Sequence, residues 1–110
     1  MNWIELRDLA ELNKIKEDSF EKPIVIFKHS TRCSISGTAL SRFERNWDLE
    51  IPAYYLDLIA YRPISAEIAE VFEIEHQSPQ VLFIENGKCI YSATHWEIDA
   101  NEIKNQLTES

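Results

Sequence analysis

Residues 23–36 of the chain read PIVIFKHSTRCSIS. A proline opens the segment, and the next four residues are β-branched or aromatic, which is typical of a central strand covered on both faces in an α/β sheet. Proline is harmless at the first position of a strand, where its missing N–H disrupts no ladder. A polar loop, residues 28–32, then leads to Cys33 and to a helix that we expect over residues 34–47. The segment therefore predicts a strand, a cysteine-bearing loop and a helix in direct succession.

A helix is also predicted before this strand. Asp8 and Glu11 have the spacing of a capping box, and apolar residues follow at helical intervals, so we expect a helix from Leu9 to Asp18. Trp3 and Ile4 precede it as a short apolar arm.

Beyond residue 50 the pattern continues with a strand and a helix. Residues 53–58 are typical of a second strand. Ser65 is then expected to cap a helix whose apolar face carries Ile68, Val71 and Phe72.

A β-hairpin is predicted next. Two apolar runs, residues 81–84 and 89–91, flank Asn86-Gly87, and Asn-Gly is the preferred pair for a tight hairpin turn. We expect these strands to be antiparallel, with Cys89 opposite Ile84.

The last helix is predicted after Asp99, which repeats the capping-box spacing with Glu102. In order, the elements form a βαβ unit followed by a ββα unit, which right-handed crossovers arrange as a three-layer α/β/α sandwich with a central mixed sheet. This α/β layout is thioredoxin-like. Because no linker, repeat or low-complexity tract interrupts it, we expect a single domain over residues 1–110.

Composition excludes several classes of partner. The chain has 110 residues, with 19 acidic against 11 basic side chains and a net charge of −8. This charge repels nucleic acid and anionic membranes, so we expect neither as a partner. The sequence contains no apolar stretch typical of a secretory signal or a membrane span. We therefore expect a cytoplasmic protein. We also expect it to be a monomer.

Cys33 is the strongest candidate for chemistry. Ligands in open α/β sheets bind beyond the carboxyl ends of the strands, which is where the predicted strand delivers Cys33. The N-terminus of a helix favours an ionised thiolate, and Lys28, His29 and Arg32 add positive charge to the segment. The alternative is a small buried hydrophobic residue, which the polar loop around Cys33 argues against.

The motif at Cys33 is monothiol. Residues 33–36 have the spacing of a redox C-x-x-C motif, but Ser36 replaces the second cysteine. Its hydroxyl can donate a hydrogen bond to Cys33 but cannot resolve a disulfide. Ser36 could also simply serve the first turn of the helix.

Cys89 is expected to be a packing residue rather than the missing resolving thiol. Opposite Ile84, it lies five residues from Pro79, or about 16 Å along a strand. Bridged cysteines need Cα atoms within about 7 Å.

Two further segments are expected at the same end of the sheet. A cis peptide at Ser78-Pro79 would leave the Ser78 backbone free to pair with a bound substrate, although trans is the general expectation. The hairpin register pairs Pro79 with Thr94, so we expect His95 and Trp96 to wall a substrate groove. Alternatively, His95 is a hydrogen-bonded loop residue and Trp96 a core aromatic.

Metal and phosphate sites are not predicted. The histidines and cysteines are scattered without short ligand spacing, and no glycine-rich phosphate loop is present.

Three segments carry a resemblance to a known family: FKHSTRCSIS at residues 27–36, EHQSPQ at 75–80 and THWEI at 94–98. Together they resemble the monothiol bacilliredoxins of the YtxJ type over nearly the whole chain. The resemblance implies a thioredoxin fold, a cis peptide before Pro79 and a role in bacillithiol metabolism. Cys33 would be the nucleophile that removes bacillithiol from mixed disulfides on oxidised proteins. Such a protein holds no bound cofactor, and its partners are S-thiolated client proteins.

Family members usually carry proline directly after the cysteine, where this chain has Ser34. The co-substrate is therefore expected to be bacillithiol or a similar low-molecular-weight thiol. The expected catalytic residues are Cys33 and Ser36. The expected substrate-binding residues are His29, Thr31, Arg32, Ser34, Ser78, Pro79, His95 and Trp96.

Two other functions stay open from the sequence. One is a non-catalytic thioredoxin-like adaptor or redox sensor whose Cys33 becomes thiolated under stress. The other is an iron–sulfur monothiol glutaredoxin, which fits less well because those proteins resemble Cys-Gly-Phe-Ser where this chain has Cys-Ser-Ile-Ser.

Overall fold

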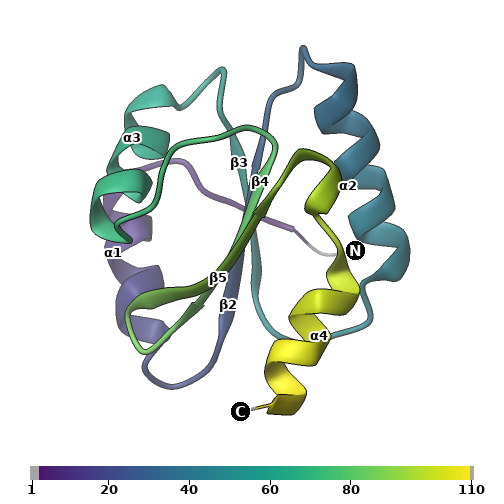
Figure 1. The fold of residues 1–110 in the computed structure, drawn as a ribbon. Helices are drawn as coiled ribbons and strands as arrows, with labels where there is room; N and C mark the ends of the chain where they lie inside the picture. Colours follow the sequence, from purple (N-terminus) through teal and green to yellow (C-terminus); the bar gives the residue numbers. More distant parts are fainter. Residues whose placement is uncertain (1–2, 110) are drawn as a thin grey trace.

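The computed structural model describes residues 3–109, and it shows a mixed sheet between two layers of helices (Figure 1). Residues 1, 2 and 110, which the predicted domain includes, lie outside the described residues. The elements in chain order are β1 (Ile4–Glu5), α1 (Leu9–Asp18), β2 (Ile24–His29), α2 (Ser34–Asn46), β3 (Ala53–Asp57), α3 (Arg62–Val71), β4 (Gln80–Glu85), β5 (Lys88–Thr94), the 3₁₀ turn η1 (His95–Glu97) and α4 (Ala100–Glu109).

The sheet has the strand order β1-β3-β2-β4-β5. β1 and β2 both run parallel to β3, whereas β4 is antiparallel to both β2 and β5. α1 and α3 cover one face, and α2 and α4 cover the other (Figure 1). The predicted three-layer, thioredoxin-like α/β fold with a mixed sheet is confirmed.

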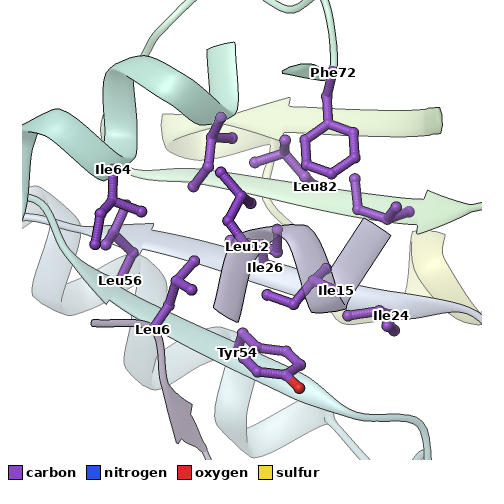
Figure 2. Close-up of a cluster of buried hydrophobic side chains, with 12 residues drawn as sticks. Leu6, Leu12, Ile15, Ile24, Ile26, Tyr54, Leu56, Ile64, Phe72 and Leu82 are labelled. Carbon is purple, nitrogen blue, oxygen red and sulfur yellow. The ribbon is translucent and has the colours of Figure 1, made fainter. Parts of the chain in front are cut away.

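β2 is buried on both faces because it lies at the centre of the sheet. Ile24 and Ile26 pack into the cluster under α1 and α3, which Figure 2 shows in close-up. Val25 and Phe27 point the other way, into the cluster under α2 and α4. Alternation along a strand produces this division, and it continues into the next two residues, Lys28 and His29.

The first helix has the predicted start. Oδ1 of Asp8 accepts the backbone N–H of Glu11 at 2.8 Å, as an N-cap residue does. The apolar arm before it contributes more than expected, because Ile4 and Glu5 pair with β3 as a short edge strand.

Ser65 does not cap α3, so that prediction is wrong. The helix begins at Arg62, with Pro63 in its first turn, where the missing N–H is tolerated. Ser65 lies inside the helix and is 1% exposed. Its hydroxyl contacts His76 instead.

The hairpin turn forms at Asn86-Gly87, and both residues have positive φ, at 54° and 75°. A Cβ on Gly87 would lie 2.8 Å from Cζ of Phe20, so both the backbone conformation and the space favour glycine. Ile84 pairs with Cys89, which confirms the predicted register at the turn.

The register at the other end of the hairpin differs by one residue. A bulge between Phe83 and Ile84 shifts the pairing, so Thr94 lies opposite Gln80 and not opposite Pro79 as predicted. His95 takes the place beside Pro79, where its N–H donates to the Pro79 carbonyl at 3.1 Å.

No helix within residues 3–109 has both the length and the apolar character needed to cross a membrane.

Candidate functional site

Cys33 is the N-cap residue of α2 and lies just beyond the carboxyl end of β2. It is half-buried, and among the described residues its Sγ makes no capping hydrogen bond. Its backbone is fixed on both sides: its N–H donates to the Ser30 carbonyl and its carbonyl accepts the Gly37 N–H, both at 3.1 Å. The sulfur therefore sits beside the unpaired N–H groups of a helix start, where a thiolate is favoured.

The loop around Cys33 presents polar side chains to solvent. Thr31, Arg32 and Ser34 are all exposed. All three lie within two residues of Cys33 in the sequence.

Ser36 bonds to the end of β2 rather than to Cys33. Its Oγ accepts the Ser30 N–H at 3.0 Å and lies 2.7 Å from Nδ1 of His29. Ser36 is 0% exposed, so this hydroxyl joins the first turn of α2 to the strand beneath it.

His29 is buried, with one ring nitrogen held by Ser36. Burial lowers the pKa of His29 below its usual value, and the nearby carboxylate of Asp57 opposes this shift. The imidazole is therefore neutral at pH 7. Nε2 of His29 makes no hydrogen bond to the described residues.

The peptide bond between Ser78 and Pro79 is cis, as the family resemblance implies. Ser78 Oγ is buried without a hydrogen-bond partner among the described residues. Its backbone N–H and carbonyl also make no backbone hydrogen bond in the described part of the chain. The polar groups of Ser78 thus make no hydrogen bond within the described part of the chain.

Trp96 is not a core aromatic, because 64% of it is exposed. It belongs to the turn η1, which begins at His95 beside Pro79. Arg42 of α2 donates to the carbonyls of Trp96 and Ile98, at 3.2 and 2.7 Å, and so ties this turn to the helix that carries Cys33. Trp96 is thus an exposed aromatic side chain on a fixed backbone.

Lys28 lies on the other face of the sheet, away from the Ser36 hydroxyl that His29 contacts. It is 0% exposed, and its Nζ lies 2.9 Å from Nδ1 of His76. Burial lowers the pKa of Lys28 to about 8. The alternation of side chains along β2 is enough to predict that Lys28 faces this side of the sheet. Its contact with His76 could not be predicted in this way, because the two residues are 48 positions apart in the sequence.

Cys89 lies beside the hairpin turn at the far end of β4 and β5. Its Sγ donates to the Tyr91 carbonyl at 3.3 Å, and burial raises the pKa of this thiol. It is partly buried against the core under α1 and α3. Both cysteines are free.

A metal centre is not formed by the residues that the structure describes, because no three His, Cys, Asp or Glu side chains gather as ligands.

Solved structures with the same fold are numerous. A thioredoxin-fold protein described as an oxidoreductase superposes with a TM-score of 0.83 and 26% identity, covering 93% of this chain and 90% of that one. The thioredoxin of Schistosoma mansoni gives a TM-score of 0.71 at 18% identity, over 98% and 94% of the two chains. The thioredoxin of Trypanosoma brucei brucei gives 0.70 at 15% identity, over 98% and 89%.

A comparison with protein families identifies the family within this fold. The family described as monothiol bacilliredoxin BrxC matches residues 4–103. This match covers most of the chain, including the Cys33 loop, the Ser78-Pro79 turn and η1. The chain therefore belongs to the monothiol bacilliredoxin family of thioredoxin-fold oxidoreductases.

Proposed function

We propose that the protein removes bacillithiol, or a similar low-molecular-weight thiol, from mixed disulfides on client proteins, with Cys33 as the nucleophile. The observation that carries the proposal is the position of Cys33: half-buried at the start of α2, without a side-chain cap and without a second cysteine at the C-x-x-C position.

The reaction proceeds in two exchanges. The Cys33 thiolate attacks the sulfur of the small thiol in the mixed disulfide, so the client leaves as a reduced thiolate and the small thiol becomes disulfide-bonded to Cys33. A second molecule of the small thiol then attacks that disulfide. It releases the oxidised small-thiol dimer and restores the Cys33 thiolate, and each step conserves electrons.

Ser36 acts in this scheme as a positioning residue. Its hydroxyl holds His29 and the Ser30 amide, and the Ser30 carbonyl in turn accepts the Cys33 N–H. His29, neutral at pH 7 and without a hydrogen bond at Nε2, is suited to accept or return the proton of a thiol near the loop.

The unpaired backbone of Ser78 and the exposed ring of Trp96 form the client-binding side of the site in this proposal. An extended client segment would pair with Ser78 by β-augmentation. In this proposal the exposed residues Thr31, Arg32 and Ser34, and His95 beside Pro79, also contact the substrate.

We further propose that the chain works as one domain in the reducing cytoplasm. Cys33 and Cys89 are both unpaired thiols, and their separate locations leave regeneration to an external thiol.

Turnover of a bacillithiolated test protein tests this function. With excess bacillithiol the wild type should release many equivalents of reduced client, while Cys33→Ser releases none and Cys89→Ser retains the wild-type rate. Release of a single equivalent, followed by arrest, would identify a thiolated adaptor or sensor instead.

A further inference from the structure

A groove lies between α3 and the segment that leads to the cis peptide. It has a volume of about 390 Å³, within the range of small-molecule pockets. Its lining residues are Leu58, Arg62, Ser65, Ala66, Ala69 and His76.

This groove belongs to the same end of the sheet as Cys33. Leu58 directly follows β3, and its N–H donates at 2.9 Å to the carbonyl of His29, the last residue of β2. His76 precedes the cis peptide by two residues. The groove is therefore joined by backbone to the end of β2, which leads to the Cys33 loop, and to the cis-peptide segment.

The polar groups of the groove are nitrogen donors and one hydroxyl. No aspartate or glutamate lines it, although the chain carries 19 of them. Arg62 forms no ion pair with a carboxylate of the described residues, where the ion pairs join Arg7 to Glu5 and Lys104 to Asp48.

A buried ammonium group lies directly behind this wall. Nζ of Lys28 is 2.9 Å from Nδ1 of His76, and Oγ of Ser65 is 3.1 Å from the same nitrogen. Burial is the cause of the lowered pKa of Lys28, to about 8, and no carboxylate opposes it. At pH 7 Lys28 is therefore mainly charged and has no counter-ion, an arrangement that costs free energy in a protein interior.

We propose that this groove binds a carboxylate of the low-molecular-weight thiol, with Arg62 and His76 as donors and Lys28 as the buried counter-charge. The inference rests on the proposed function and adds the substrate group that this chain recognises. Leu58, Ala66 and Ala69 supply an apolar wall for the uncharged part of the ligand. An acidic side chain of the client could offer the same carboxylate, so the experiment separates the two sources.

The test uses peptides whose single cysteine is flanked only by glycine and serine. One is capped by cysteine and the other by cysteamine, two thiols that differ by one carboxylate. The wild type should turn over the cysteine-capped peptide about tenfold more efficiently, as expected for one charge-assisted hydrogen bond. Arg62→Gln should bring the ratio of kcat/KM close to one, while Arg45→Gln, an exposed charge change on α2, should leave it unchanged.

Two results would overturn the inference while leaving the proposed function intact. In one, Arg62→Gln keeps the wild-type ratio of kcat/KM between the two peptides. In the other, Arg45→Gln lowers that ratio as much as Arg62→Gln does. A cysteamine-capped peptide with a glutamate beside its cysteine tests the other source, and a carboxylate preference seen only there would assign the groove to the client.

Failure of the proposed function is a different outcome, in which the wild type turns over neither peptide. In that case, binding of succinate, a small dicarboxylate, still tests whether the groove binds a carboxylate. The side-chain NMR signals of Arg62 and His76 should shift with succinate in the wild type, and unchanged signals would contradict a carboxylate site.

Discussion

Oγ of Ser36 lies 2.7 Å from Nδ1 of His29, and the same hydroxyl accepts the Ser30 N–H at 3.0 Å. The first turn of α2 is thereby fastened to the end of β2, and the loop that carries Cys33 is held between them. A residue that stands at the resolving position of a C-x-x-C motif thus has a structural task in this chain.

Ser36→Ala should destabilise the protein by about 1–3 kcal/mol, because it leaves a buried imidazole nitrogen and a backbone N–H without a partner. It should also lower kcat/KM, since the Cys33 loop loses its anchor. Urea unfolding gives the stability change. Ser41→Ala, an exposed serine on the same helix, is the control and should stay within about 0.5 kcal/mol of wild type. Equal stability of the two variants would show that the Ser36 hydroxyl holds nothing.

The two glycines should respond in opposite directions to alanine. Gly87 has φ of 75°, and a Cβ there would meet Phe20 at 2.8 Å, so Gly87→Ala should cost about 1–2 kcal/mol. Gly37 lies inside α2, and apart from its chain neighbours and the helix backbone no atom lies within 4 Å of its Cβ position, so Gly37→Ala should stabilise by about 0.5–1 kcal/mol. Thermal unfolding of both variants checks the signs, and a stabilised Gly87→Ala would contradict the hairpin geometry.

Lys28 should make stability depend on pH in the alkaline range. Its pKa is about 8 when folded, against an ordinary value of 10.5, so the unfolded chain binds more protons between these values. Stability contributed by this site is therefore lowest below pH 8 and rises as the pH approaches 10.5. His76, the neighbour of Lys28, has a lowered pKa and is already neutral there.

Lys28→Met is the comparison that isolates this effect. Between pH 7 and 10.5 the unfolding free energy of the wild type should rise by up to about 3 kcal/mol relative to the variant. Urea titrations at several pH values measure the difference. Parallel pH curves for the two proteins would mean that Lys28 is not buried as a charge.

Trp96→Ala should separate client binding from chemistry. The ring is 64% exposed, so stability should change by less than about 0.5 kcal/mol. Loss of an aromatic anchor should reduce kcat/KM for protein clients about tenfold, with little change for a small disulfide. Ile90→Ala removes another exposed apolar side chain, away from η1, and should affect neither. A similar loss with both substrates would place Trp96 in the thiol-exchange step.

Features with strong local signals could be predicted from the sequence. The unbroken apolar run of β2, the Asp8 cap and the Asn86-Gly87 turn each depend on residues close together in the chain, and each forms as predicted. The cysteine at the carboxyl end of β2 also follows from local order, because a strand, a short loop and a helix place it there.

Features that depend on contacts between residues far apart in the chain could not be predicted from the sequence. No glycine marks the bulge beside Ile84 in the sequence. The predicted pairing near Pro79 therefore differs from the observed pairing by one residue. Serine is a residue type that often caps helices, but Ser65 lies inside α3 and its hydroxyl contacts His76. Lys28 is buried against the segment that contains His76. Only tertiary packing places that segment next to β2.

Intact-mass analysis of a single turnover tests the role of Cys33 most directly. After mixing with a bacillithiolated client, the protein should gain the mass of one bacillithiol, located on Cys33 by peptide mapping, and should lose it when excess bacillithiol is added. An adduct on Cys89, or an intramolecular disulfide between Cys33 and Cys89, would contradict a monothiol site at the start of α2.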